Sequence, residues 1–424
     1  MSAAARTPHL RRSNLALVID QLRRRGPCSR SQLVTATGLT RSAIAGLVGE
    51  LEHLGLVIEE RSTSDGRPGR PSPLVRIDGR SIGALAIEIF VDEIGASIVA
   101  LDGTVVSSVR LARARDRVTV DSTIADIATL LDQLGERADR DDERRLVGCG
   151  VSVPGLVRAL DGVVVVAPNL GWFDVALADA IASVLDGDLP ISVGNDADLG
   201  ALAESRFGAG VGAYQMVFVS GEVGVGGGLV AAGLPIVGTH GFAGEIGHMP
   251  VNPDGQRCRC GSVGCWETEV GESALLSRAG LDPDGGRVAV DDLLERAAAA
   301  EPSVVAALAV QARWLAIGIA GLVNVLDPDT VVLGGLFARI LPSIRATLDD
   351  ELELRRYRAA RRDVAVVGAA LGPRAVTVGA AELAFGALLG DEAPKTDSAI
   401  RTVFDERKER DAALPEHMQS FDDD

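Results

Sequence analysis

The residues that most constrain the fold of this chain lie in positions 241–267, with the sequence GFAGEIGHMPVNPDGQRCRCGSVGCWE. Cys258, Cys260 and Cys265 follow the spacing C-x-C-x4-C. His248 lies ten residues before the first of these cysteines. Three thiols and one imidazole form a complete tetrahedral set for structural zinc and leave no position open for a catalytic water. The spacing therefore predicts a loop held by Zn2+.

A disulfide with one thiol left over is the alternative interpretation of the three cysteines. The sequence has five cysteines in 424 residues, and its start, MSAAARTPHLRRSN, is basic and lacks the apolar core of a signal peptide. We therefore expect a cytoplasmic protein, in which thiols stay reduced and closely spaced cysteines favour metal. Cys28 and Cys149 have no partners at ligand spacing and are predicted to be small buried residues.

Two carboxylates, Glu245 and Glu267, flank the predicted zinc motif. A metal ion would fix the position of both. Carboxylates accept several hydroxyl hydrogen bonds at once, so a fixed acidic pair predicts a binding site for a polyhydroxylated ligand. The alternative is that both residues are solvent-exposed acids near a zinc loop.

Charge divides the chain into two parts. Residues 1–80 contain thirteen Arg and no Lys against seven Asp and Glu, a net charge of +6, whereas the whole chain carries −17 and the remainder therefore −23. A basic N-terminal part on an acidic body predicts that only the first part binds a polyanion.

The length predicts two or three domains, and the 47% of apolar residues with few aromatics suits α/β layers. Because no stretch of about twenty uncharged apolar residues occurs, a membrane span is not predicted.

The basic part has the pattern of a helix-turn-helix. A helix over residues 14–25 is expected to end before Gly26-Pro27, and Ser29 to cap a short helix that closes at Gly38. The next helix is predicted to place five apolar residues on its buried face: Ile44, Leu47, Val48, Leu51 and Leu54. This second helix of the motif would enter a major groove. Its exposed first turn offers small or hydrogen-bonding side chains for DNA contacts: Thr40, Arg41, Ser42 and Ala45.

Two β-like runs around a turn rich in Gly, Pro and Arg follow, which predicts a wing. In the segment GRPGRP at 66–71, proline keeps the backbone extended while Arg67 and Arg70 project toward a narrow minor groove. A solvated arginine loop or a head that binds protein is the alternative. The adjacent helix-turn-helix favours DNA.

From residue 81 onward, strands and crossover helices alternate in two rounds, which predicts two α/β lobes with a cleft between them. Asp196 follows the strand at 191–194, at the end where ligands of α/β proteins usually bind. A helix N-cap is its alternative role. The predicted domains are a winged helix-turn-helix at 1–80, lobe 1 at 81–190 completed by a helix near 376–389, and lobe 2 with the zinc site at 191–375. The charged tail at 390–424 is predicted to be disordered.

Seven short motifs resemble the ROK family (repressors, open reading frames and sugar kinases), and the resemblance covers residues 13 to about 390. They are VSVPG at 151–155, APNLGW at 167–172, GNDAD at 194–198, VGVGGGLV at 223–230, GEIGH at 244–248, CRCGSVGCWE at 258–267 and VLGG at 332–335. The cysteine motif and GEIGH are highly specific, whereas glycine runs alone are weak signals.

The resemblance implies an actin-like, ribonuclease-H-like two-lobed domain that holds a hexose or N-acetylhexosamine. In that family the sugar is held by the positions matching Asn195, Asp196, Glu245, His248 and Glu267. Gly155 and Asn169 lie in matching segments. The aspartate matching Asp196 is the base that deprotonates the sugar hydroxyl in the kinases. Whether His248 binds zinc alone or also touches sugar stays open.

One departure from the family bears directly on function. The kinases begin this domain with Asp-x-Gly-Gly-Thr, a phosphate-binding turn, where this chain has EIFVD at 88–92. Ile89, Phe90 and Val91 favour an uninterrupted strand with bulky side chains. Glu222-Val223-Gly224 stands where the family has Gly-Thr-Gly, which puts a repelling carboxylate near the phosphates. The third element, Gly334-Gly335, is retained, although two glycines after a strand also serve plain packing. Loss of ATP-dependent phosphoryl transfer is therefore predicted.

These observations predict a sugar-responsive DNA-binding transcriptional regulator, a repressor that binds operator DNA as a homodimer or homotetramer. Its kinase-like domain would sense a hexose, pentose or N-acetylhexosamine without phosphorylating it. The rival prediction is an ATP-dependent ROK sugar kinase, glucokinase-like, that carries a DNA-binding head. A regulator whose head docks a protein partner is the third.

Overall fold

The structure, a computed structural model, describes residues 6–60, 73–113, 118–137, 144–158, 161–185, 187, 189–355 and 364–389. The predicted wing residues Arg67 and Arg70 and the tail at 390–424 lie outside these ranges.

The N-terminal domain is a three-helix unit with a small antiparallel sheet, in the strand order β1-β3-β2. Its elements are α1 (Arg6–Arg25), β1 (Cys28–Ser29), α2 (Arg30–Thr37), α3 (Arg41–His53), β2 (Val57–Glu60) and β3 (Leu74–Ile77). Ser29 forms a capping box with Gln32, and Gly38 closes α2 at φ +70°, a conformation that favours glycine. Thr40 caps α3 through a hydrogen bond from the Ala43 N–H at 3.2 Å. This is the helix-turn-helix that the sequence predicts.

The prediction that Leu54 is buried in the core of this domain is wrong. Leu54 is 53% exposed, whereas Ile44 and Leu51 of the same predicted face are buried. Helix α3 ends at His53, and Gly55 at φ +69° turns the chain so that Leu56 enters the core instead. The apolar stripe therefore stops one turn earlier than its periodicity indicates.

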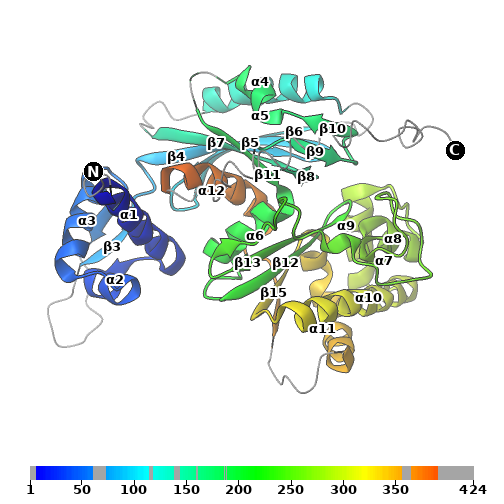
Figure 1. Cartoon of the computed structure of the whole chain (residues 1–424). Helices are drawn as coiled ribbons and strands as arrows, with labels where there is room; N and C mark the ends of the chain where they lie inside the picture. The colour runs from blue at the N-terminus through cyan, green and yellow to red at the C-terminus, as the bar shows by residue number, and fades with distance from the viewer. Residues whose placement is uncertain are drawn as a thin grey trace, which may run out of the picture. The chain divides into compact units, whose positions relative to one another are not determined.

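Lobe 1 is built on a five-stranded sheet in the order β11-β7-β4-β5-β6. Its elements are β4 (Ile82–Ile89), β5 (Glu93–Ala100), β6 (Val105–Ala112), α4 (Val120–Arg137), β7 (Arg145–Val153), α5 (Leu177–Ala182), β11 (Ile191–Asn195) and α12 (Ala375–Leu389). Helix α4 covers one face, and α12 packs on β4 and β7 on the other (Figure 1). A side sheet precedes α5, with β8 (Leu156–Val157), β9 (Val164–Ala167) and β10 (Trp172–Val175) in the order β10-β9-β8.

Two expectations about lobe 1 need correction. Strand β11 pairs in parallel with β7, so the sheet of lobe 1 extends through Asn195, past the boundary predicted at residue 190. The strand that follows α5 returns to the same sheet by a crossover, which the sequence pattern alone does not assign to either lobe. The strand predicted to continue through Phe90 and Val91 ends at Ile89. There the chain reverses into β5, with the Phe90 N–H donating to the Glu93 carbonyl at 2.9 Å.

Lobe 2 repeats the same topology in the order β14-β13-β12-β15-β16, with three antiparallel strands followed by two parallel ones. Its strands are β12 (Gln215–Gly221), β13 (Val225–Ala231), β14 (Leu234–Pro235), β15 (Thr330–Gly334) and β16 (Ala365–Gly368). Its helices are α6 (Asp196–Phe207), α7 (Trp266–Val270), α8 (Glu272–Arg278), α9 (Gly286–Ala298), α10 (Pro302–Leu326) and α11 (Gly335–Arg355). The predicted two-lobed fold is confirmed.

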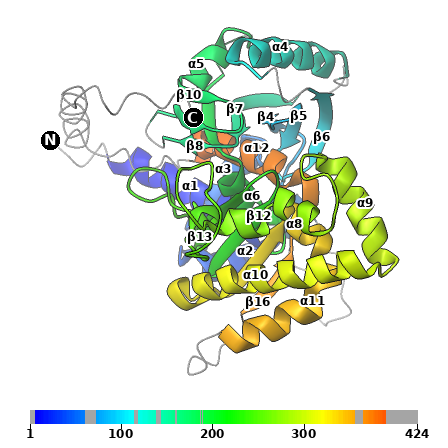
Figure 2. The same ribbon diagram turned by 90° about the vertical axis from the view of Figure 1, so that its right-hand side faces the viewer.

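Helices α10 and α11 run side by side and cover one side of this lobe (Figure 2). Among the described residues, α10 is the one helix long and apolar enough to cross a membrane, and 56% of its apolar window is buried inside the protein. Leu315 and Ile319 of α10 belong to the core that also holds Phe337 of α11. This burial is that of a core helix in a globular domain.

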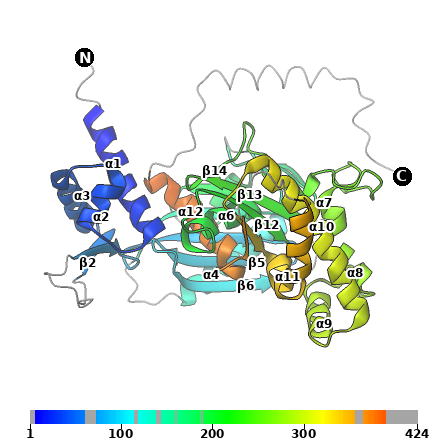
Figure 3. The same ribbon diagram turned by 90° about the horizontal axis from the view of Figure 1, so that it is seen from below.

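Helix α6 connects the two lobes. It follows β11 of lobe 1, packs on β12 and β13 of lobe 2, and lies against α12. Helix α12 in turn contacts α1 of the N-terminal domain (Figure 3). The chain thus brings three helices that are far apart in sequence into contact.

Candidate metal centre and the adjoining acidic cluster

Residues 248–265, which we call the metal loop, carry the four predicted metal ligands. Glycines and short-range hydrogen bonds shape the backbone of this loop. Cys258 N–H donates to the Ser262 carbonyl at 2.8 Å, and Gly261 N–H returns to the Cys258 carbonyl at 3.0 Å. Gly264 has φ +74°, and a Cβ atom there would lie 1.7 Å from the Asn252 carbonyl oxygen. The loop closes tightly because this position carries no side chain.

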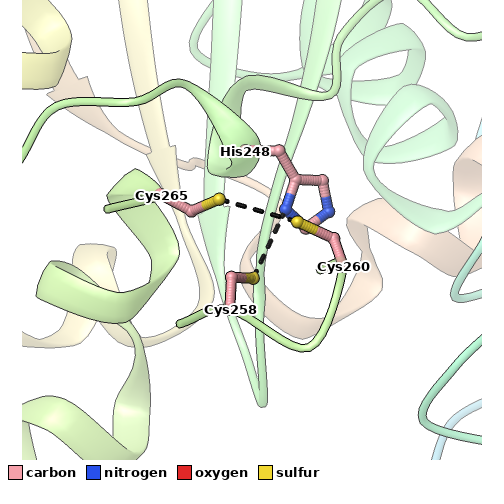
Figure 4. Close-up of side chains that lie close together, drawn as sticks. All are labelled: His248, Cys258, Cys260 and Cys265. Carbon is pink, nitrogen blue, oxygen red and sulfur yellow. Dashed lines mark hydrogen bonds between the residues drawn. The ribbon is translucent and has the colours of Figure 1, made fainter. Parts of the chain in front are cut away.

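The four predicted ligands come together in this loop. His248 lies in a short 3-10 helix (Ile246–His248), and Cys265 directly precedes α7. The ligand atoms of His248, Cys258, Cys260 and Cys265 all lie within 4.8 Å of one another. Figure 4 shows the side chains converging, with Cys258 Sγ 3.8 Å from His248 Nδ1 and Cys260 Sγ 3.6 Å from Cys265 Sγ.

This donor set suits a metal ion. A zinc–sulfur bond of about 2.3 Å places tetrahedral sulfur atoms roughly 3.8 Å apart, close to the separations found here. Cys258 and Cys265 are buried, while Cys260 lies on the outer side of the loop. Three soft thiols and one imidazole select zinc over the hard cations that prefer oxygen. The four residues could therefore hold a metal ion.

Glu267 lies between the metal loop and strand β13. Its Oε2 accepts a hydrogen bond from the Val225 N–H at 2.9 Å, and its Oε1 lies 3.6 Å from Cys258 Sγ. A Cβ atom on Gly224 would lie 2.4 Å from Glu267 Oε2, so the carboxylate packs directly against the Gly224 backbone because this residue has no side chain. The geometry links this carboxylate to the metal loop on one side and to lobe 2 on the other.

The start of α6 brings a second group of predicted residues into place. Asn195 is the N-cap, since its Oδ1 accepts from the N–H groups of Ala197 and Asp198. Its Nδ2 donates to the Gly155 carbonyl at 2.9 Å. Gly155 has φ +149°, and a Cβ atom there would meet the Val166 oxygen at 2.5 Å. The capping role that sequence offered as an alternative for Asp196 thus belongs to Asn195.

Four carboxylates form what we call the acidic cluster: Asp196, Asp198, Glu245 and Glu267. Burial and the charge of Glu245 raise the pKa of Asp196 to about 6. Burial, with the charges of Glu245 and Asp196, raises the pKa of Asp198 to about 8. Burial and the charge of Glu267 also raise the pKa of Glu245, although His248 opposes this. Desolvated acids that repel one another favour a neutral ligand with several hydroxyl donors over an anionic one.

Sequence reasoning missed two residues here. Asp198 follows Asp196 by two positions in the first turn of α6, and this spacing in the motif GNDAD could have indicated it. Arg259 lies between two of the candidate metal ligands, and its Nη1 donates to Asn169 Oδ1 at 3.2 Å. Asn169 lies in the turn between β9 and β10, so this contact joins the side sheet of lobe 1 to the metal loop. No sequence signal indicates that Arg259 and Asn169 are in contact.

The two segments that the sequence predicts to match the phosphate-binding turns of the kinases each carry a glutamate of this chain. Glu88 of β4 is fully buried, and its Oε2 accepts from Arg110 Nη2 at 2.8 Å. Glu222 lies against Gly335, where an added Cβ atom would be 2.4 Å from its Oε1. Gly335 is the first residue of α11, and a helix N-terminus attracts anions. A carboxylate of the chain therefore stands at the helix end suited to a phosphate.

The predicted DNA-contacting residues of α3 are placed on its outer side. Thr40, Arg41, Ser42 and Ala45 are all exposed, and so are Gly46 and Gly49. A Cβ atom on either of these glycines would touch nothing within 4 Å. The exposed face of α3 is therefore narrow, as a helix that enters a groove requires.

The fold and these sites define a two-lobed domain of the sugar-kinase type, preceded by a winged helix-turn-helix domain. Residues 84–387 match the ROK family, and the chain belongs to that family, which confirms the family predicted from its motifs. Residues 16–68 match the MarR family.

Similar proteins include regulators and kinases. The chain is 28% identical over 376 residues to the xylose repressor of Bacillus subtilis, an alignment that covers 87% of this chain and 94% of that protein. It is 29% identical over 320 residues to the glucokinase of Streptomyces coelicolor, covering 71% of this chain and 96% of the kinase.

Solved structures give the same picture of the fold. A ROK family transcriptional regulator, a homologue of the E. coli MLC protein, superposes with a TM-score of 0.74 over 91% of this chain and 99% of that chain at 23% identity. A ROK glucokinase from Streptomyces griseus in complex with glucose and AMPPNP gives a TM-score of 0.62 at 28% identity, covering 71% of this chain and 98% of the kinase.

Proposed function

We propose that this chain is a sugar-responsive DNA-binding repressor whose two-lobed domain binds a free sugar and does not phosphorylate it. The observation that carries the proposal is the contrast between two parts of that domain. The acidic cluster beside the metal loop retains the groups that hold a sugar, whereas Glu88 is buried against Arg110 where a kinase needs an open phosphate turn. Phosphoryl transfer depends almost wholly on positioning and charge neutralisation of the phosphates.

The relatives support a regulator. The alignment with the xylose repressor covers 87% of this chain and nearly all of that protein, so it reaches into the N-terminal domain. The alignment with the glucokinase covers nearly all of the kinase but only 71% of this chain. A kinase function would therefore explain the two-lobed domain but would give the helix-turn-helix domain no role.

In the proposed site, hydroxyl groups of the sugar donate to Asp196, Glu245 and Glu267, with Asn195, His248, Gly155 and Asn169 completing the contacts. Asp198 adds a fourth carboxylate. His248, Cys258, Cys260 and Cys265 would hold Zn2+, which supplies the rigidity that keeps Glu245 and Glu267 at a fixed separation. The effector is a free hexose, pentose or N-acetylhexosamine, because the acidic cluster disfavours a sugar phosphate.

Operator DNA is the proposed macromolecular partner, bound by α3 and the wing of a homodimer or homotetramer in the cytoplasm. Sugar binding favours one arrangement of the two DNA-binding heads. A preference of about 1–3 kcal/mol is enough to change operator affinity 5- to 150-fold.

Thermal unfolding of the zinc-loaded protein tests the sensor against the kinase. D-xylose, D-glucose, N-acetyl-D-glucosamine and their phosphates are each added with and without Mg-ATP. A ligand at 100 times its dissociation constant adds about 2.7 kcal/mol to the free energy of unfolding. We expect a free sugar to raise the melting temperature, Mg-ATP to add nothing, and Asp196→Asn to abolish the effect while the exposed Asp350→Asn retains it. A shift that requires ATP, with sugar-dependent ADP release, would establish the kinase instead.

A further inference from the structure

Two arginines and one glutamate are buried together where α1, α6 and α12 meet. Arg23 and Arg206 are each 5% exposed, and Glu382 is 1% exposed. Glu382 pairs through one carboxylate oxygen with Arg23 and through the other with Arg206. The guanidinium of Arg23 also lies 5.7 Å from the ring centroid of Phe207 and 5.4 Å from that of Phe385. We call Arg23, Glu382 and Arg206 the buried triad.

The buried triad is a poor device for stability alone. Taking ions out of water costs several kcal/mol each, and apolar residues often replace a buried ion pair without loss. The same junction already has an apolar contact, since Val18, Ile19 and Leu22 of α1 share one core with Ala380 and other residues of α12. Charge pairs with fixed geometry add a preferred orientation of α1 on α12, which apolar contacts leave less well defined.

Helix α6 extends from the acidic cluster to the buried triad. It begins at Asp196, whose carboxylate lies in the acidic cluster, and Arg206 lies in its last turn. The helix has 12 residues, and its backbone hydrogen bonds make it a rigid connection between its two ends. A displacement of Asp196 therefore moves Arg206.

Helices α6 and α12 are locked together as well. Glu204 of α6 is fully buried and accepts hydrogen bonds from the N–H groups of Ala370 and Leu371, at 3.0 and 2.8 Å, in the segment that leads into α12. Gly379 of α12 lies against Leu199 of α6 with no room for a Cβ atom. The two helices are expected to move as one body.

We infer that the buried triad couples the sugar site to the DNA-binding domain, with Arg23 as the residue that positions α1 on the α6–α12 pair. Sugar binding shifts α6, the shift reaches Glu382 through Arg206, and α1 follows because Arg23 is held by the same carboxylate. This inference rests on the proposed function and names the route by which that function is regulated.

Arg23→Met in the zinc-loaded 424-residue chain tests the coupling, because methionine retains an apolar stem between Phe207 and Phe385 and removes the charge. Arg11→Met is the matched control. Arg11 lies in the same helix and pairs with Glu50, but this ion pair is exposed and stays within the N-terminal domain. The measured quantity is the ratio of dissociation constants for DNA with and without saturating D-xylose, and separately D-glucose. The DNA is a duplex selected by the unchanged chain from a random-sequence library.

We expect the unchanged chain and Arg11→Met to share a ratio between about 5 and 150 for the effective sugar, and Arg23→Met to give a ratio near 1. Arg23→Met should still bind the sugar, as seen in its melting temperature. A full ratio in Arg23→Met overturns the inference and leaves the proposed function intact. A ratio of 1 in the unchanged chain with both sugars contradicts the proposed function itself, and the inference with it. If Arg23→Met does not fold, Arg23→Lys replaces it as the test variant. Lysine keeps the positive charge but lacks the planar guanidinium, so we expect a smaller ratio of DNA dissociation constants than in the unchanged chain.

Discussion

Gly379 of α12 lies so close to Leu199 of α6 that a Cβ atom at Gly379 would be 2.0 Å from the Leu199 carbonyl oxygen. The contact is between backbones, so neither helix can yield without moving as a whole. Gly379→Ala is therefore expected to lower the free energy of unfolding by about 1–3 kcal/mol or more. Urea denaturation of the variant and the unchanged chain measures this difference in the free energy of unfolding.

Gly321→Ala is the control for this change. Gly321 also lies inside a helix, α10, but a Cβ atom there would touch nothing within 4 Å. Alanine should raise the free energy of unfolding by up to about 1 kcal/mol, because it is the better helix former. Similar effects of the two substitutions would mean that α6 and α12 are not in close backbone contact.

The acidic cluster predicts a stability that rises as pH falls. An aspartate in the unfolded chain has a pKa of about 3.9. The folded pKa values are raised, to about 6 for Asp196 and about 8 for Asp198. The folded state therefore binds more protons than the unfolded state between pH 4 and pH 8. Its free energy of unfolding should be highest below the unfolded pKa and decline as pH rises through the two folded pKa values.

Asp198→Asn isolates this contribution. Because asparagine carries no charge, the variant should be more stable than the unchanged chain by roughly 4–5 kcal/mol at pH 8 and by only about 1–2 kcal/mol at pH 5. Chemical denaturation at both pH values measures the difference, and the exposed Asp350→Asn provides the comparison. A variant that is less stable at pH 8 would show that Asp198 has a favourable partner in the folded protein.

Removing the metal ligands should weaken lobe 2. An ion bound at a thousand times its dissociation constant contributes about 4 kcal/mol to the folded state. Cys265→Ser is expected to lose bound zinc, measured by elemental analysis of the purified chain, and to melt at a lower temperature. Cys149→Ala, at a buried cysteine of lobe 1 far from the loop in sequence, should retain one zinc per chain. Zinc retained in Cys265→Ser at full occupancy would contradict the ligand set.

Arginines of the N-terminal domain should govern the salt dependence of DNA binding. Each phosphate contact contributes about 0.9 to the slope of the logarithm of affinity against the logarithm of salt concentration. Arg41→Ala with Arg67→Ala should weaken binding and reduce this slope by about 2 if both arginines reach phosphates. Arg339→Ala, on α11 of lobe 2, should leave the slope unchanged. An unaltered slope in the double variant would favour a head that binds protein.

Features encoded by neighbouring residues could be predicted from the sequence. Ser29, Gly38 and Thr40 begin and end their helices where expected because capping depends on a few adjacent positions. The four predicted metal ligands lie together because a short loop with positive-φ glycines closes over them. The family motifs led to the two-lobed fold for the same reason, since each motif is local.

Features that depend on distant residues could not be predicted. The lobe to which β11 belongs is decided by its pairing with β7. Leu54 is exposed because Leu56 instead enters the core, which it shares with Val75 and Ile77 further along the chain. Nothing near Arg23 in the sequence indicates Glu382 as its partner, and the first of three consecutive arginines at a helix end has the pattern of a surface residue. Tertiary packing decides all three.

The most direct test of a sugar-responsive repressor is the affinity of the 424-residue chain for its selected DNA duplex. The affinity is measured at fixed salt and zinc, without any nucleotide, and with and without D-xylose, D-glucose or N-acetyl-D-glucosamine. We expect one free sugar to change the dissociation constant at least about 5-fold, with no ATP required. Constant DNA affinity with every sugar, accompanied by sugar-dependent ADP release when Mg-ATP is added, would contradict this expectation.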